Sequence, residues 1–585
     1  MKRKNLFLSL ISSILVAVAI VTLTVFSVIK PKTNNKDGVP GAENININNG
    51  VSDKDDLATK YDLENKFNRN GSEEYPYIIY SADNFKTWIS QLGGEKRLVT
   101  VPVTEEIIDE NGETKTVNKL DEYGHLVFVK VLDENEKDTY DVNHFELVND
   151  IDFNGVEYKT LFNNGKAFIG KIDGNGYALK NITINVNEKN FETDFSFVKD
   201  GNRYSRIALF GETKGAVIKD ITIDNLKVSV PSIVYSYISA AKYEIENPYA
   251  EMVVAGVSAY ATNTTLSNVT LNADVDGSSY FINDVDKDGN YLAENAMGGV
   301  VAVAENLIIE KSKINVKVSA NAGGEYLVGG IAAYGTTAKV ANSTINVEMS
   351  TSYSRRLTMA GMFAYGRSLD VKDTKVNFTL KEIAGTDARN AYVASLTKDG
   401  KAKASEMPTA AGLVAVLRAN NDAQKTKISN VKVTSNIDFD CIYAGAVLDV
   451  YSTDAFNKAL VTLSDIVVDA SANVLALHGI ARQLVATTVT YSEDARIEGY
   501  CNVKLAGDVK LSVYEVQINS TTTDNRDVMT ILVATKEVDD KTGVNYIAFS
   551  WSDLYVEISS NLNSKLVLGD AIAALIKSFG SFKVV

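Results

Sequence analysis

In this sequence of 585 residues, the short acidic segment 284–290 (DVDKDGN) is the clearest candidate for a site that binds a metal ion. Carboxylates alternate at positions 1, 3 and 5 of the segment and Gly289 follows at position 6, a spacing typical of the start of an EF-hand-like calcium loop. The twelfth position, usually a bidentate glutamate, is Asn295, and a solvated acidic loop is the alternative interpretation. The predicted calcium ligands are Asp284, Asp286, Asp288 and Asn290. The sequence indicates no requirement for any other cofactor.

Three further carboxylates, Asp150, Asp152 and Asp173, are candidates because enzymes that act on polysaccharides use clustered carboxylates as acids, bases or calcium ligands. Asp173 begins the turn sequence Asp-Gly-Asn-Gly, and the other two flank the end of a predicted strand. Asp side chains at such places usually accept hydrogen bonds from the local backbone. We therefore expect these residues to be structural, and the sequence predicts no catalytic residue.

The composition removes several classes of function. The chain has three histidines and two cysteines, which leaves few routes to a zinc site or to Ser-His-Asp catalysis. The formal net charge of −15 and the pI near 5.0 argue against nucleic acid, because phosphate binding needs a basic stripe. Cys441 and Cys501 allow one disulfide at most, and a bridge and a pair of buried thiols both fit the sequence.

These residues belong to a chain whose main body repeats. Each unit starts with a small residue, continues with an apolar segment rich in alanine and tyrosine, and ends with a polar turn and an alternating strand. The intervals between successive anchors are 48, 43, 31, 31, 51, 33 and 34 residues, which indicates a basic unit of about 31 to 34 residues with insertions. The anchors are Ala208, Gly256, Gly299, Gly330, Gly361, Gly412, Gly445 and Gly479.

The alternating segments decide the fold class. Segments such as 314–318 and 345–349 alternate apolar with polar residues over about five residues, which is typical of a strand with one buried side. Helical repeats need a period of 3.6 over ten or more residues, and a propeller blade usually needs about 40 residues or more. The sequence therefore predicts an all-β protein, a parallel β-helix solenoid in which the inward side chains stack into one core.

Two sets of side chains recur at equivalent positions of successive units. Tyr260, Tyr334 and Tyr365 share one position, and we expect them to stack from coil to coil and stabilise the solenoid. A second set points outward and forms either a platform for a glycan or a host protein, or simply a hydrated face. It includes Thr270, Asn272, Asn315, Lys317, Asn346 and Asn377.

The opening of the repeat region resembles a known family. The stretches 145–153 (FELVNDIDF), 168–177 (FIGKIDGNGY) and 179–184 (LKNITI) look like the first coils of pectate-lyase-like β-helix surface proteins, and 71–92 is similar to what precedes such coils. The glycine-led units resemble the GLUG-type repeats of bacterial surface proteins and adhesins, although Ala or Tyr often replaces the second glycine. The likeness, over about residues 71–503, implies a right-handed parallel β-helix, a place at the cell surface, and adhesion or carbohydrate contact, with no catalytic residue.

The amino terminus carries an export signal. Lys2, Arg3 and Lys4 precede an uncharged, mostly apolar run from Leu6 to Ile29, which as a helix is long enough to cross a hydrocarbon core of about 30 Å. The run is either a retained transmembrane anchor or a cleaved signal peptide, and no clear small-residue cleavage site follows it. The positive-inside rule places everything after Lys32 outside the cytoplasm.

The rest of the chain divides by composition. A helix with one apolar face is predicted between Ser81 and Gly93, and a second short helix at 569–577; covering an end of the solenoid is the simplest role of each. The predicted organisation is a signal anchor or signal peptide at 1–30, a flexible linker at 31–70, an N-terminal cap region with a short helix at 71–144, parallel β-helix repeats at 145–515, and C-terminal coils and cap at 516–585.

These expectations combine into a function. We expect a non-enzymatic protein of the bacterial cell surface, secreted or on the outer face of the membrane, that serves adhesion or binds carbohydrate or protein through the β-helix surface. The alternatives are a structural component of the envelope, and a polysaccharide lyase or glycoside hydrolase on a β-helix scaffold. The expected partners are the membrane, through the N-terminal helix, and an extracellular glycan or a protein of a host or neighbouring cell; nucleic acid is not among them.

Overall fold

The computed structural model describes most of the chain between residues 53 and 517, and the compact unit discussed below starts at Lys60. The described residues are 53–187, 189–230, 249–277, 281–282, 294–320, 322–323, 326–352, 357–383, 408–418, 422–439, 441–451, 461–473, 476–478, 481–483, 489–491, 496–497, 501–505, 509–513 and 516–517. Within these ranges no helix is both long and apolar enough to cross a membrane. The predicted apolar span at 6–29, the acidic loop at 284–290 and the helix at 569–577 lie outside them.

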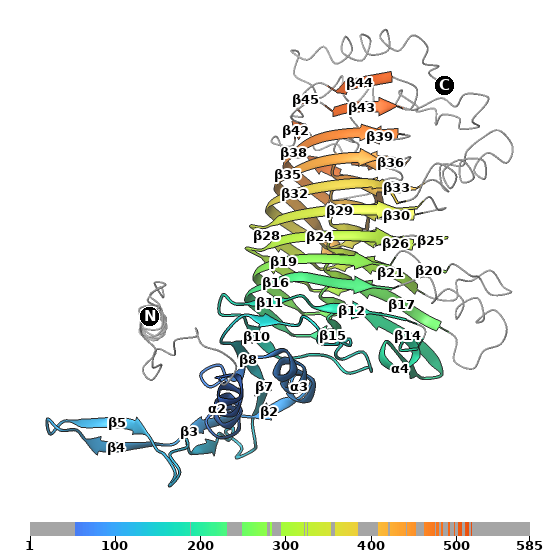
Figure 1. Cartoon of the computed structure of the whole chain (residues 1–585). Coiled ribbons are helices and arrows are strands. Elements are labelled where there is room, and N and C mark those ends of the chain that lie inside the picture. The colour runs from blue at the N-terminus through green and yellow to red at the C-terminus, as the bar shows by residue number, and fades with distance from the viewer. Residues whose placement is uncertain are drawn as a thin grey trace, which may run out of the picture. The chain divides into compact units, whose positions relative to one another are not determined.

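The body is a solenoid of parallel strands in three sheets (Figure 1). From β14 onward, successive coils contribute a strand to each sheet, and each of these strands pairs with the equivalent strand of the next coil. Only the end pairs β13–β14 and β43–β44 are antiparallel among the described strands of these three sheets. The expectation of an all-β protein built from parallel sheets is confirmed.

The first sheet has 18 strands, namely β1 (Tyr77–Ile79), β8 (His144–Leu147), β9 (Ile151–Asp152), β10 (Lys171–Asp173), β11 (Ala178–Lys180), β12 (Thr183–Asn185), β16 (Val217–Ser229), β19 (Thr265–Asp276), β23 (Ile308–Glu310), β24 (Lys313–Ala320), β28 (Lys339–Ala341), β29 (Thr344–Thr351), β32 (Asp370–Glu382), β35 (Thr426–Asp438), β38 (Val461–Asn473), β41 (Val489–Tyr491), β43 (Cys501–Leu505) and β44 (Val509–Val513). The second has nine, namely β13 (Ser196–Lys199), β14 (Asn202–Ile207), β17 (Tyr249–Ala255), β21 (Glu294–Gly298), β26 (Tyr326–Gly329), β30 (Leu357–Ala360), β33 (Thr409–Ala411), β36 (Ile442–Ala444) and β39 (Ala476–His478). The third has eight, namely β15 (Phe210–Lys214), β18 (Ser258–Thr262), β22 (Val301–Glu305), β27 (Ala332–Thr336), β31 (Phe363–Arg367), β34 (Val414–Arg418), β37 (Val447–Tyr451) and β40 (Ala481–Gln483).

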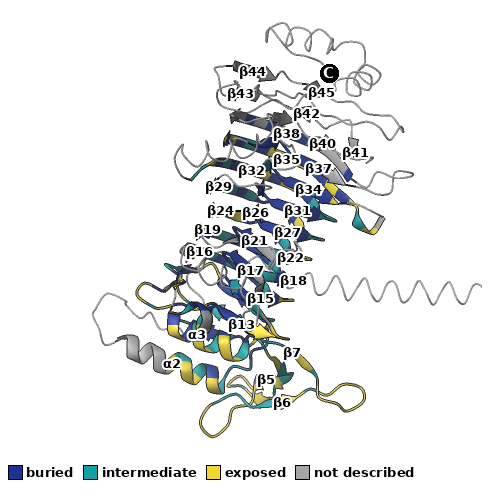
Figure 2. Ribbon diagram, turned by 90° about the vertical axis from the view of Figure 1, so that its right-hand side faces the viewer, coloured by how far each residue is buried: buried dark blue, intermediate teal, exposed yellow. Residues whose placement is uncertain are grey.

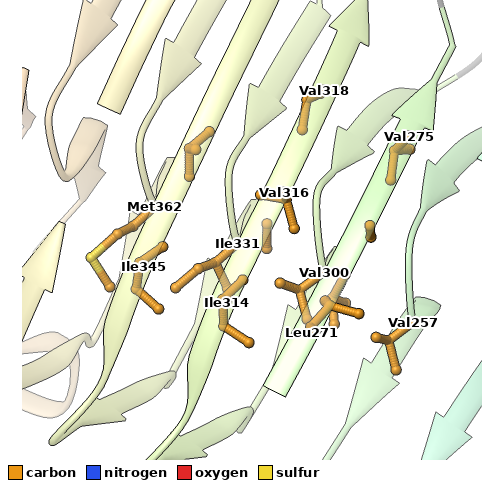
Figure 3. Packing of buried hydrophobic residues seen from close by; sticks show 14 of the residues in the cluster. Val257, Leu271, Val275, Val300, Ile314, Val316, Val318, Ile331, Ile345 and Met362 are labelled. Atoms are coloured by element: carbon orange, nitrogen blue, oxygen red, sulfur yellow. The ribbon is translucent and has the colours of Figure 1, made fainter. Parts of the chain in front are cut away.

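The core is a continuous column of inward-facing side chains. Strand pairing is in register, so Ile314 in β24 lies beside Ile345 in β29, which lies beside Val376 in β32. All three side chains are buried. Figure 3 shows the stacking for neighbouring coils, with the corner residues Ile331 and Met362 beside it. The alternation predicted from the sequence is confirmed, because one side of each of these strands faces the core.

The corners of the solenoid differ in how much chain they contain. The corner between the second and third sheets has two residues in every coil from β14–β15 to β36–β37. The corner between the first and second sheets varies: five residues separate β24 from β26, and 26 separate β32 from β33. The unequal intervals of the repeat therefore come mainly from one corner.

The anchor glycines begin the constant two-residue corner. Gly299, Gly330 and Gly361 directly follow β21, β26 and β30. A Cβ atom at any of the three would overlap the main-chain carbonyl oxygen of the anchor glycine one coil further on. Because that oxygen belongs to the backbone, it has little freedom to give way. The repeated glycine is therefore a consequence of the close approach of adjacent coils.

The outward asparagines of the first sheet form a hydrogen-bonded ladder. Asn272 donates to Asp224 at 2.8 Å, and Asn315 donates to Asn272 at 2.7 Å. Asn346 donates to Asn315, and Asn377 to Asn346, each at 2.6 Å. The amides of the expected polar platform are thus hydrogen-bonded to one another along the solenoid, which gives these residues a structural role.

Breaking this ladder in the middle should cost more than breaking it at its end. Asn315 both donates and accepts within the ladder, so Asn315→Ala removes two hydrogen bonds and should lower the free energy of unfolding by about 2 kcal/mol. Asn377→Ala removes one of the ladder bonds and should cost about 1 kcal/mol. Urea unfolding of the full chain measures both. If both variants lose the same free energy of unfolding, the hydrogen bonds between the ladder asparagines do not contribute to stability as proposed.

The expected stack of three tyrosines is only partly formed. Tyr334 and Tyr365 pair across β27 and β31, with ring centroids 5.6 Å apart. Val303 occupies the same position in the coil between Tyr260 and Tyr334 and so separates these two rings. The stack predicted for Tyr260 is therefore wrong, because the coil that starts at Gly299 lies between the tyrosine-bearing coils. The guanidinium of Arg206 lies over the Tyr260 ring, 4.4 Å from its centroid.

The predicted N-terminal helix is observed as α3 (Ala82–Leu92). The side chain of Ser81 caps it by accepting a hydrogen bond from the backbone N–H of Asn84 at 3.1 Å. Phe85 and Ile89 on its apolar face are buried against the first coils. Gly93 follows as the C-cap.

The flexible linker predicted at 31–70 requires a correction, because it contains the helix α2 (Asp53–Phe67). The side chain of Asn65 is buried, donates to the carbonyl oxygen of Ile78 at 2.8 Å and accepts from its N–H at 2.7 Å. Tyr61 stacks on Tyr80, with centroids 5.4 Å apart. Helix α2 contains few apolar residues, so these contacts with β1 and with Tyr80, which follows β1, are what hold it in place.

Three two-stranded antiparallel ribbons connect α3 to β8, and we call residues 96–142 the hairpin arm. They pair β2 (Lys96–Leu98) with β7 (Tyr140–Val142), β3 (Thr100–Pro102) with β6 (Phe128–Lys130), and β4 (Thr104–Ile108) with β5 (Thr114–Asn118). The remaining small elements are α4 (Phe191–Asp194), η3 (Asp422–Gln424), β20 (Phe281–Ile282) with β25 (Ala322–Gly323), and β42 (Arg496–Ile497) with β45 (Val516–Gln517).

Candidate functional site

A concave site of about 510 Å³ lies beside the first coils, and six of its fourteen lining residues are asparagines. We call it the asparagine groove. Its asparagines are Asn154, Asn181, Asn185, Asn187, Asn190 and Asn225. Thr183, Lys227 and Glu157 complete its polar lining, and Phe153, Tyr158 and Phe195 line its apolar part.

Two asparagines of the first sheet form part of the groove wall: Asn181 lies between β11 and β12, and Asn225 lies within β16. Asn181 and Asn225 have φ of 59° and 54°, in the left-handed region that asparagine tolerates better than most residues. Asn225 donates to Asn181 at 2.7 Å, and Asn181 donates to Asp152 at 2.9 Å. This short ladder fixes the orientation of both amides, so the wall is set before any ligand arrives.

Another part of the groove lining is a loop held by its own amides. Asn190 accepts a hydrogen bond from the N–H of Asn187 at 2.7 Å and donates to the carbonyl oxygen of Asn185 at 3.0 Å. The side chains of Asn185 and Asn187 are exposed. On the adjacent strands, Thr183 in β12 pairs in register with Lys227 in β16, and both side chains are exposed.

The aromatic residues give the groove a rigid base. Phe153, Tyr158 and Phe195 are each at most 2% exposed, so their ring faces are covered and offer no stacking surface. The hydroxyl of Tyr158 donates to the carbonyl oxygen of Leu209 at 3.2 Å. Burial raises the pKa of Tyr158 well above its usual value, so this hydroxyl stays a neutral donor.

The lining determines what the groove can do chemically. An amide side chain offers both donors and an acceptor, which matches ligands that carry hydroxyl groups. Glu157 is the single carboxylate among the lining residues described. Hydrolysis of a glycosidic bond by the usual route needs two carboxylates flanking that bond. The geometry at this place therefore favours binding over that reaction.

The carboxylates considered from the sequence are engaged in local structure, as expected. The hydrogen bond from Lys180 at 2.7 Å lowers the pKa of Asp150, and the hydrogen bond from Asn181 lowers that of Asp152. Asp173 pairs with Lys219 at 2.8 Å. The lowered pKa values keep Asp150 and Asp152 ionised at neutral pH, which makes them poor general acids.

The predicted metal ligands and cysteine pair are only partly within the described chain. Asp284, Asp286, Asp288 and Asn290 lie outside it, so the calcium site stays a prediction. In the residues that are described, no group of three or more His, Cys, Asp or Glu side chains could hold a metal ion. Cys441 is buried, and β43 starts at Cys501, whose side chain is not described.

The sequence contained a signal for the groove that the sequence analysis did not use. Four of its six asparagines lie in the ten residues 181–190. The periodic pattern drew attention to the later asparagines of the first sheet instead, which turn out to form a ladder. The asparagine groove depends on the loop at 153–158 folding beside β12. The periodic pattern of the sequence does not reveal such a loop.

Comparison with known proteins gives a limited result. No family model matches the chain, which leaves the GLUG-type repeats without support. No curated protein matches it either. One matching solved structure is described as a "putative immunoglobulin A1 protease from Bacteroides ovatus", with 12% identity, a TM-score of 0.29, and coverage of 71% of this chain and 86% of that one. Another is described as "IgA1 Protease", with 14% identity, a TM-score of 0.30, and coverage of 72% and 26%.

These matches correct the functional expectation. Both proteins are described as proteases, which contradicts the prediction of a non-enzymatic adhesin, and we withdraw that prediction. With TM-scores near 0.3, the matches carry no argument about the activity or substrate of this chain. The resemblance stated from the sequence holds at a coarser level, that of a solenoid of parallel sheets.

Proposed function

We propose that the asparagine groove is a ligand-binding site for a neutral, hydroxyl-rich chain, that is, for an oligosaccharide on a glycan or glycoprotein. The observation that carries this proposal is the amide lining of a concave site next to the first coils. The proposed site is this groove and not the outward face of the later coils, because the groove is concave and the side chains of Asn185 and Asn187 in its lining are exposed.

Four properties of the groove support a neutral sugar ligand. A sugar hydroxyl donates and accepts, as a side-chain amide does. Lys227 and Glu157 contribute one charge of each sign, so the lining favours neither anionic nor cationic ligands. The volume of about 510 Å³ falls in the usual range of small-ligand sites. The hydrogen bonds at Asn181 and Asn225 fix part of the lining in advance, which lowers the entropy cost of binding.

The full chain should bind neutral oligosaccharides on a glycan array in preference to sialylated or sulfated ones. Asn185 and Lys227 are exposed in the groove, so the double variant Asn185→Ala/Lys227→Ala should lose about two hydrogen bonds to the ligand. That loss, about 2 kcal/mol, corresponds to roughly thirtyfold weaker binding. Titration calorimetry with the best array ligand measures it, and analysis of the ligand after incubation shows whether it has also been cleaved.

A matched control removes the same side-chain types elsewhere on the first sheet. Lys432 and Asn436 are exposed in β35, outside the groove. Lys432→Ala/Asn436→Ala should leave the affinity unchanged. The proposal fails if both double variants bind alike, or if no neutral oligosaccharide binds the unmodified chain.

We further propose that the chain is exported and displayed on the bacterial cell surface, with residues 6–29 in the membrane or removed as a signal peptide. The charged start and the long apolar run support this. For the solenoid we propose right-handed coils, because crossovers between parallel strands of one sheet are almost always right-handed. Calcium binding at Asp284, Asp286, Asp288 and Asn290 remains part of the proposal on the strength of its spacing.

A further inference from the structure

The hairpin arm exposes more apolar surface than any other described part of the chain. Of the eleven large hydrophobic side chains that are exposed among the described residues, eight lie in the arm. Ile108 and Tyr123 are each 75% exposed. The others are Val101, Ile107, Leu120, Val129, Leu132 and Tyr140. Figure 2 shows that residues of all types are exposed on β5, β6 and the adjoining hairpins, as they also are on parts of α2 and α3.

The hairpin arm has almost no hydrophobic core in which these apolar side chains could be buried. Its three ribbons are two-stranded, so each strand has a second edge that no described strand covers. All five residues of β4 and four of the five residues of β5 are exposed. An isolated two-stranded ribbon is marginally stable in water, and an exposed apolar edge strand invites another strand. Such a surface is typical of a site for strand addition.

Three equivalent turns make the arm acidic. Asp109, Asp121 and Asp133 are spaced twelve residues apart, and each carboxylate accepts hydrogen bonds from the backbone N–H groups two and four residues later, at 2.8 to 3.0 Å. The pKa of Asp109 is lowered mainly by the hydrogen bond from the side chain of Lys115 and further by these backbone bonds, which are the main cause of the lowered pKa of Asp121 and Asp133. Glu110, Glu122 and Glu134 follow them directly.

The charge balance selects the kind of partner. Residues 96–142 contain twelve Asp and Glu against six Lys and Arg, which is a formal net charge of −6. A second copy of the arm would bring like charges together, and an anionic lipid surface would repel it. A basic polypeptide strand would be attracted, and its apolar side chains would cover those of β4 and β5.

We propose that the hairpin arm is a docking surface for an extended, basic and apolar polypeptide segment, which adds as a strand to the β4–β5 ribbon. The segment hydrogen-bonds to a free strand edge, packs its apolar side chains against Ile108 on one face of the ribbon, and places its Lys or Arg residues near the acidic turns. None of these residues lines the asparagine groove, so this interaction is separate from ligand binding there.

Blocked decapeptides test the proposal directly on the full chain. An alternating Lys-Val peptide should bind at least tenfold more tightly, by fluorescence anisotropy, than an alternating Glu-Val or Lys-Ser peptide. The first comparison isolates charge and the second isolates apolar contact. Raising the salt concentration from 50 to 300 mM should weaken binding of the Lys-Val peptide several-fold.

A variant within the arm and a control variant outside it distinguish specific binding at this site from non-specific binding. Ile107→Thr/Ile108→Thr keeps strand-forming side chains but removes apolar surface, and should weaken binding of the Lys-Val peptide at least fivefold. Val198→Thr changes a side chain that is 47% exposed on another antiparallel ribbon, and should leave binding unchanged.

Three results would overturn the proposal. The first is equal binding of the Lys-Val and Glu-Val peptides. The second is undiminished binding of the Lys-Val peptide by the double isoleucine variant. The third is a concentration-dependent dimer of the unmodified chain, seen by sedimentation and lost in that variant, because it would identify a second copy as the occupant.

Discussion

Gly330→Ala should lower the free energy of unfolding of the solenoid by about 3 kcal/mol or more. The added Cβ would overlap the carbonyl oxygen of Gly361 in the next coil and also meet the side chain of Val347. A side chain at this corner can escape only if two coils move apart, which breaks hydrogen bonds between paired strands and opens the core. Urea unfolding of the full chain, followed by circular dichroism, measures the loss.

Gly112→Ala is the appropriate comparison. Gly112 lies in the turn between β4 and β5 with φ of 81°, and a Cβ there would meet no atom within 4 Å. The substitution should cost about 1 kcal/mol from backbone strain, confined to the hairpin arm. If Gly330→Ala costs no more than Gly112→Ala, the coils approach less closely at the anchor glycines than we describe.

Phe168→Ala should cost about 3 to 5 kcal/mol, concentrated at the N-terminal end of the solenoid. Its fully buried ring stacks on Phe210, with centroids 4.9 Å apart, and lies near Phe145 and Phe162. Gly93, which ends α3, leaves space for the same ring. Amide hydrogen exchange should therefore show reduced protection in α3, β8 and β10, and little change in β24 and β29, because each coil depends mainly on its neighbours.

Phe128→Ala provides the control for this experiment. Phe128 is half-buried in the hairpin arm and makes an edge-to-face contact with Tyr75, with centroids 5.6 Å apart. Its removal should cost about 1 kcal/mol and leave exchange in α3 unchanged. A uniform loss of protection over all coils after Phe168→Ala would contradict a local role for the ring.

The repeat could be predicted because close packing restricts residue type at fixed places. Where the backbone passes within contact distance of the next coil, glycine is strongly favoured, so Gly299, Gly330 and Gly361 mark the coils in the sequence. Inward side chains must be apolar, so the strands alternate. Helix α3 was predictable for the same kind of reason, since Ser81 and Gly93 satisfy local requirements of a helix end.

The features that sequence analysis missed depend on contacts between distant segments. Helix α2 is held in part by the hydrogen bonds of Asn65 to Ile78, and nothing in its own composition indicates them. The tyrosine stack failed at Tyr260 because an intervening coil carries Val303 at that position. The asparagine groove depends on the loop at 153–158 lying beside Asn181 and Asn225 of the first sheet. The twelve-residue spacing of Asp109, Asp121 and Asp133 was visible in the sequence, but its meaning depends on the hairpins.

The variable corner between the first and second sheets has a consequence for how this chain can change over generations. The first-sheet strand and the next second-sheet strand are separated by five residues in one coil (β24 to β26) and by 26 in another (β32 to β33), while the first-sheet strands keep their register from coil to coil. A longer connection there adds little closure entropy and disturbs no core contact. New segments can therefore be acquired at this edge with small loss of stability, and successive coils would present them side by side.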